Sequence, residues 1–158
     1  MTASNGTERA LDPCGPADAA ALAEFLREVD LTLSGLDEPS VRLWVQRDER
    51  GLVVGSTGYE LSADRRAALI RSVAVHPAHR AAGRGTALAR FALERAADEG
   101  AVTAWLFSRR SGPFWQRLGF VAADRDELAA ALPDARQVRL FQETGRMGIE
   151  VAWSMPLR

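Results

Sequence analysis

The segment 68–100, ALIRSVAVHPAHRAAGRGTALARFALERAADEG, restricts the possible folds more than any other part of the chain. It begins with an aliphatic, β-branched stretch at 69–75, which is typical of a buried strand. Pro77 ends this strand, because proline has no amide with which to continue a sheet ladder. Apolar residues then recur at helical spacing over 85–99, and Gly100 follows where a left-handed residue commonly ends a helix. The pattern predicts a strand, a loop and an amphipathic helix whose buried face includes Leu88, Phe91, Ala92 and Ala96.

The loop of this segment joins two glycines, Gly83 and Gly85, to two arginines, Arg80 and Arg84. A helix N-terminus presents amides without helical partners and a positive dipole end, and glycine lets a ligand approach the backbone closely. The pattern R-x-x-G-x-G differs in spacing from the dinucleotide fingerprint and from the P-loop. By itself it also fits a plain turn. Its place between a strand and an amphipathic helix favours a site for a phosphate group.

Composition places the chain among ordinary globular proteins. Its 158 residues suit one domain, and 20 basic against 21 acidic residues give a net charge of −1. This balance does not indicate nucleic acid or a membrane surface as the main partner. A single cysteine and two histidines argue against a disulfide or a cysteine-based metal site, and we expect no metal. We expect a polar tail at 1–8, a domain at 9–158, no membrane-spanning segment and a cytoplasmic location.

The remaining pattern predicts a mixed α/β fold. The strand predicted at 101–107 has little polar content, so we expect it to be the interior, parallel neighbour of 69–75 in a right-handed strand–helix–strand unit. Gly55 and Gly58 interrupt another predicted strand and suggest a bulge or a close approach. The segment 134–148 is ambiguous. Further helices are predicted at 19–29, 113–118 and 126–132, and further strands at 9–13, 41–47, 52–61, 120–122 and 151–155.

The order VAVHP, R-x-x-G-x-G, helix, strand and FWQRLGF (114–120) resembles the GNAT superfamily of acetyl-CoA-dependent N-acetyltransferases. The resemblance covers 8–158 in element order and is most specific over 69–122. It implies an α/β, GNAT-like fold with a central, twisted, mostly antiparallel sheet flanked by helices. IRSVAV (70–75) and RDELAAAL (125–132) are similar to a subfamily linked to arsenic resistance in bacteria.

The resemblance implies acetyl-CoA as co-substrate. Its pyrophosphate would lie on the amides of Gly83, Gly85 and Thr86, with charge added by Arg80 and Arg84. The pantetheine arm would follow 73–75, where a backbone amide would polarise the thioester carbonyl as in an oxyanion hole. The residues implied along the arm and its sulfur end are Val73, Ala74, Val75, Ser108, Ser111, Phe114 and Trp115.

Trp115 departs from the pattern of the family. Many relatives carry a tyrosine at this position, which protonates the leaving thiolate. An indole N–H is a donor but not a usable acid at neutral pH. The acid is therefore missing, or it is supplied by solvent, by the substrate or by another residue. Tyr59 is a poor replacement. The departure also keeps open a catalytically weak, acyl-CoA-binding sensor or regulatory domain.

For the acceptor side, Glu60 is the candidate general base, although a solvated carboxylate on an edge strand is the competing interpretation. Asp37 and Glu38 lie in a Gly/Pro loop at the position of an acceptor-site lid. Arg71 is expected to share a strand face with Val73. A charge in so apolar a strand should be paired, so Arg71 is predicted to hold an anion of the substrate or to form a structural ion pair.

Together these features predict transfer of an acetyl group to a primary amine of a small molecule, either amino-acid-like or a toxic amine. Direct attack is expected, because no serine or cysteine stands in a nucleophile–base arrangement. Acetylation of protein N-termini is a further alternative, without any peptide-groove signature to support it. Because many relatives pair through late strands, the resemblance also implies a homodimer.

Overall fold

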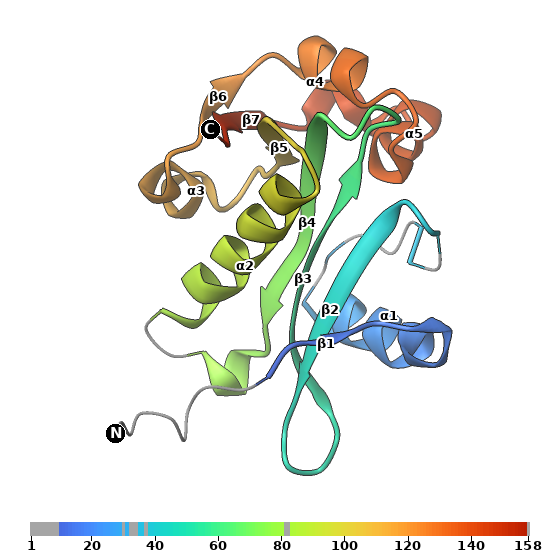
Figure 1. Ribbon diagram of the computed structural model, residues 1–158, viewed down its shortest axis with the longest axis vertical. Coiled ribbons are helices and arrows are strands. Elements are labelled where there is room, and N and C mark those ends of the chain that lie inside the picture. The colour runs from blue at the N-terminus through green and yellow to red at the C-terminus, as the bar shows by residue number, and fades with distance from the viewer. Residues whose placement is uncertain (1–9, 30, 32–34, 37, 81–82, 158) are drawn as a thin grey trace.

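A computed structural model describes residues 10–29, 31, 35–36, 38–80 and 83–157. In this part of the chain seven strands form one sheet in the order β1-β2-β3-β4-β5-β7-β6, with helices on both faces (Figure 1). The strands are β1 (Asp12–Pro13), β2 (Val41–Arg47), β3 (Val53–Leu61), β4 (Ala67–Val75), β5 (Thr103–Phe107), β6 (Val121–Ala123) and β7 (Ala152–Pro156). The helices are α1 (Ala19–Glu28), α2 (Arg84–Asp98), α3 (Gly112–Leu118), α4 (Arg125–Ala131) and α5 (Arg136–Glu143), with short 3-10 turns at Pro16–Asp18, Pro77–His79 and Arg146–Ile149.

The sheet is antiparallel except where β4 and β5 run side by side in the same direction, as the sequence predicts. These two strands pair only over Ala67–Leu69 and Thr103–Trp105. Beyond this short ladder they separate, and the later residues of β4 pair with β3 alone. The separation opens the interior of the sheet at the carboxyl ends of β4 and β5.

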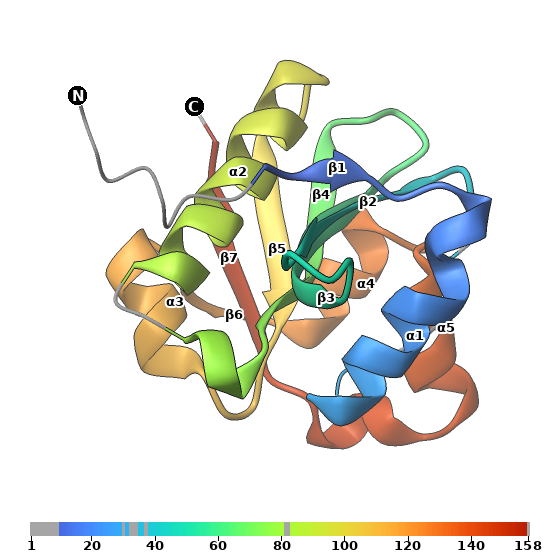
Figure 2. The same ribbon diagram turned by 90° about the horizontal axis from the view of Figure 1, so that it is seen from below.

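Helices cover the two faces of the sheet unequally (Figure 2). Helix α2 lies on one face, where Leu88, Ala92 and Ala96 are buried, as predicted. Phe91 is only partly buried and meets the edge of Trp44. The opposite face holds α1 over β2, and α4 and α5 over β4 and β5.

A bulge in β4 changes which side chains share a face. Two residues, Ser72 and Val73, stand opposite the single residue Thr57 of β3, and Ser72 has a φ of 59°. The extra residue reverses the alternation of the strand. Val73 therefore packs in the α2-side cluster with Ile70, whereas Arg71 turns to the opposite face. The expectation that Arg71 and Val73 share a face is wrong for this reason.

The ambiguous segment 134–148 forms α5 and the turn that follows it. Ala135 is the N-cap of α5 and offers no side-chain acceptor. The carboxylate of Glu60, far away in the sequence, instead accepts hydrogen bonds from the amides of Arg136 and Gln137. A contact between distant segments thus starts this helix.

Candidate active site

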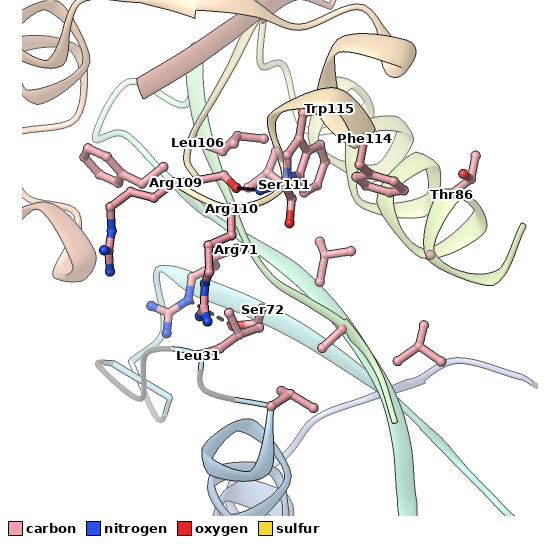
Figure 3. Close-up of a pocket in the computed structure, with 18 of the residues that line it drawn as sticks. Leu31, Arg71, Ser72, Thr86, Leu106, Arg109, Arg110, Ser111, Phe114 and Trp115 are labelled. Carbon is pink, nitrogen blue, oxygen red and sulfur yellow. Dashed lines mark hydrogen bonds between the residues drawn. The ribbon is translucent and has the colours of Figure 1, made fainter. Parts of the chain in front are cut away.

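A cavity of about 670 Å³ occupies the opening between β4 and β5. Its walls are residues 70–75 of β4, residues 106–111 at the end of β5, the start of α2 at 83–86, and one face of α3. Figure 3 shows Thr86 and Phe114 at one end and Arg71, Arg109 and Arg110 at the other, with Ser111 and Trp115 between them. The proposed cofactor residues that line it are Val73, Ala74, Val75, Arg80, Gly83, Arg84, Gly85, Thr86, Ser108, Ser111, Phe114 and Trp115.

The start of α2 has the geometry of an anion site. Gly83 is the N-cap with a φ of 87°, a conformation that glycine adopts without strain. Its carbonyl accepts from the amide of Ala87, so the amides of residues 84–86 precede the helical ladder. A Cβ on Gly85 would lie 3.6 Å from the ring of Phe114, in ordinary contact. Arg80 donates to the carbonyl of Val75 (3.1 Å), which ties the loop to the end of β4. These amides, glycines and arginines fit a pyrophosphate group.

The charge of the cavity is strongly positive. Among its described lining residues, Glu150 is the one acidic side chain. The basic residues that line it are Arg71, Arg80, Arg84, Arg109, Arg110, Arg117 and Arg146. Such an excess of guanidinium groups favours anionic ligands along the whole length of the cavity.

Glu60 and Arg71 form a buried ion pair on the α5 side of the sheet. The guanidinium Nη1 of Arg71 lies 2.8 Å from Oε2 of Glu60, and the two side chains are 0% and 1% exposed. Burial lowers the pKa of the Arg71 guanidinium, and the nearby Glu60 carboxylate opposes that shift. Glu60 does not line the cavity, and its oxygens are engaged by Arg71 and by α5. Glu60 is therefore neither the predicted base nor a solvated edge carboxylate.

Arg71 is both a structural partner of Glu60 and part of the cavity wall. Its Nε donates to Oγ of Ser72 (3.2 Å), an interaction drawn in Figure 3. Its Nη2 is buried and has no hydrogen-bond partner in the described part of the chain. A buried donor without a partner costs about 1–3 kcal/mol, more when it is charged. An anion bound in the cavity would supply an acceptor.

Trp115 is held edge-to-face between two phenylalanines. Its ring centroid lies 4.9 Å from that of Phe114 and 5.4 Å from that of Phe120. Next to it, Oγ of Ser108 accepts from the amide of Ser111 (3.0 Å), and the carbonyl of Ser108 accepts from the indole of Trp153 (2.9 Å). These contacts fix the loop after β5 and the start of α3 as one wall of the cavity.

A protein-family model described as the Acetyltransferase (GNAT) family matches residues 8–120 of the chain. The chain belongs to this family. It is thus an acyltransferase of the GNAT acetyltransferase family, with the mixed, helix-flanked sheet of that fold. A search of curated proteins finds no match.

Solved structures with the GNAT fold are similar to the chain over most of its length. N-acetylglutamate synthase from Neisseria gonorrhoeae, complexed with coenzyme A and N-acetyl-glutamate, has 20% identity and a TM-score of 0.71, over 96% of this chain and 36% of that chain. The chain thus spans about a third of that protein. A putative acyl-CoA N-acyltransferase from Klebsiella pneumoniae has 21% identity and a TM-score of 0.66, over 96% and 99%. Rv2747 from Mycobacterium tuberculosis, solved in complex with CoA, has 20% identity and a TM-score of 0.67, over 90% and 95%.

Other candidates for this GNAT site lie elsewhere. Tyr59 does not line the cavity and donates to Glu99, and burial, with that hydrogen bond, raises the pKa of its phenol. It cannot serve as the thiolate acid. Asp37 lies outside the described residues. Glu38 pairs with Arg136 (3.2 Å) and is not part of the cavity wall.

The GNAT cavity also contains residues that the sequence did not reveal. They come from α5 and the turn after it, within and next to the segment whose pattern was ambiguous. The sequence indicates these residues only through their position, because the segment that carries them precedes β7, the strand that pairs with β5. These residues are Gln137, Phe141, Arg146 and Glu150.

No helix in the described ranges combines the length and the apolar character needed to cross a membrane. Within the same ranges, no group of three or more His, Cys, Asp or Glu side chains could hold a metal ion.

Proposed function

We propose that this chain transfers the acetyl group of acetyl-CoA to the primary amine of a small, amino-acid-like molecule that carries a carboxylate or a similar anion. The observation that carries this proposal is Nη2 of Arg71, a buried cationic donor without a partner in the described residues, on a residue of the cavity wall. A carboxylate matches the planar fork of a guanidinium. The acceptor's anion would thus bind beside the point where the thioester arrives.

The proposal orders the cavity from one end to the other. The pyrophosphate would bind the amides at the start of α2, and the pantetheine arm would follow β4 towards Ser111 and Trp115. The amine nitrogen would attack the thioester carbon, and the electron pair of the C–S bond would leave on sulfur. Support for acetyl-CoA comes from the family match and from neighbours solved with CoA, one of which also holds an acetylated amino acid.

Release of CoA thiol on mixing acetyl-CoA with an amine panel tests the proposal. The panel should contain acidic and neutral amino acids, arsenic-containing amino acids, amine antibiotics without a carboxylate, and peptides with free N-termini. Turnover confined to amino acids would support it, and turnover of an arsenic-containing amino acid would extend it to an arsenic-resistance function. Preference for peptides or for amines without an anion would contradict it.

Replacing Arg71 with lysine should raise the KM for the acceptor about 10- to 100-fold while the KM for acetyl-CoA stays unchanged. Lysine keeps a cation beside Glu60 but loses the second arm of the fork, and a hydrogen bond to a charged group contributes about 1.5–3 kcal/mol. Steady-state kinetics with each substrate varied in turn measure both constants. An equal rise in both KM values would instead indicate a general distortion of the site.

Trp115, which lines the cavity, supports a second candidate, an acyl-CoA-binding domain without effective catalysis, because in the resemblance it stands at the position of the family's tyrosine acid. Trp115→Tyr should preserve or increase the rate if that acid is absent from the wild type, since a phenol can protonate the thiolate. The initial rate of thiol release measures this effect, with acetyl-CoA affinity as the control. A large loss of rate with unchanged affinity would mean that the acid lies elsewhere and that the indole packs the site. Binding without release on any amine would favour the sensor.

A further inference from the structure

Glu150 is the one acidic residue among the described residues that line the cavity, and the other charged lining residues are arginines. It ends the turn Arg146–Ile149, two residues before β7, and its side chain is 5% exposed. The next residue, Val151, accepts a hydrogen bond from the amide of Ser108 (2.9 Å), where β5 ends. The backbone of Glu150 therefore lies beside the opening between β4 and β5.

The carboxylate of Glu150 keeps capacity for a further donor. Its Oε1 lies 3.5 Å from Nε of Arg109, and its Oε2 lies 3.2 Å from Nη2 of Arg146. Each oxygen can accept two hydrogen bonds, so one guanidinium contact leaves room for another donor.

The loop that carries Glu150 is tied to the start of α4 by hydrogen bonds. Nη1 of Arg125, at the start of α4, contacts the carbonyls of Met147 (3.1 Å), Gly148 and Glu150 (3.2 Å). A single guanidinium thus contacts three carbonyls of the turn and of the residue that follows it. Such support is what a catalytic side chain needs in order to keep its geometry.

On the basis of the proposed function, we propose that Glu150 is the general base of the transfer. The surrounding arginines repel an ammonium ion, so the cavity selects the neutral amine. As the nitrogen forms its bond to the thioester carbon it becomes strongly acidic, and a carboxylate is then a sufficient base. The proton passes from nitrogen to an oxygen of Glu150, directly or through one water, while the C–S electron pair leaves on sulfur and the thiolate takes a proton from solvent.

Glu150→Gln tests this assignment, because the amide keeps the shape and hydrogen-bonding capacity of the side chain but cannot take the proton. We expect kcat to fall about 100-fold or more, the range for loss of a general base, with an unchanged KM for acetyl-CoA. Glu150→Asp should retain part of the activity, and added formate should partly restore Glu150→Ala. Circular dichroism and calorimetric binding of CoA verify that each variant is folded. Glu143→Gln, the same change at an exposed position of α5 outside the cavity, should behave as wild type.

The outcomes separate this inference from the function on which it rests. If the wild-type enzyme acetylates an amine and a folded Glu150→Gln variant does so equally fast, the role of Glu150 is overturned but the proposed function is not. Equal losses in Glu150→Gln and Glu150→Asp, without rescue by formate, also overturn it, since they indicate a purely structural ion pair. A wild-type protein that transfers to no amine overturns the proposed function and this assignment together.

Discussion

Replacing Gly85 with aspartate should weaken binding of acetyl-CoA about 100-fold or more, which corresponds to about 2.8 kcal/mol at 1.4 kcal/mol per factor of ten. Gly85 lies in the first turn of α2, among amides that fit a pyrophosphate. An aspartate there places a negative charge against the phosphates and a side chain where the ligand must approach the backbone. Isothermal calorimetry with CoA and acetyl-CoA measures the loss.

Gly85→Asn is the matched control, because asparagine has the shape of aspartate without its charge. It should bind more tightly than Gly85→Asp, and the ratio of the two affinities isolates the charge. The backbone at Gly85 has no positive φ, and a Cβ there meets only ordinary contacts, so both variants should fold. Wild-type affinity in a folded Gly85→Asp variant would exclude this loop as the phosphate site.

Replacing Glu60 with alanine should lower the free energy of unfolding by about 3–5 kcal/mol, the usual cost of removing one partner of a buried ion pair. The change leaves the guanidinium of Arg71 buried without its carboxylate. It also removes the acceptor of the first two amides of α5. Denaturant unfolding followed by circular dichroism gives the difference directly.

Two further variants test the cause. Glu38→Ala removes the partner of Arg136 in a largely exposed pair and should cost less than about 1 kcal/mol. Glu60→Gln combined with Arg71→Met should recover most of the stability, because the amide oxygen still accepts from α5 and no charge is buried. If Glu60→Ala were no less stable than Glu38→Ala, the buried pair would not support the fold.

The fold was largely predictable because its signals are local. The strand, the glycine loop and α2 follow one another within the segment 68–100, and Gly100 and Gly119 end helices with φ values of 108° and 114°. The stretch 101–107, which has little polar content, correctly indicated an interior strand parallel to β4. The residues predicted for the cofactor lie together in one cavity for the same reason.

The part of the cavity wall near Arg71 and Glu150 was less predictable, because the contacts that determine it join distant segments. The first turn of α5 depends on Glu60 rather than on a residue beside it, so no capping signal precedes the helix. The face of the sheet on which Arg71 lies depends on a bulge at Ser72. Serine is not a residue type that predicts a positive φ. The location of Glu150 follows from the tertiary contacts of the turn before β7, which Arg125 holds.

The two contacts of Glu60 restrict which substitutions homologues can carry at this site. The same carboxylate holds Arg71 in the cavity wall and starts the helix that brings Gln137 and Phe141 to that wall. A substitution at Arg71 that changes acceptor preference therefore leaves an unbalanced charge under α5. We expect homologues that replace this arginine with a neutral residue to change position 60 as well, so that the two positions vary as a pair, whereas Arg109 and Arg146 on the surface loops can vary independently of them.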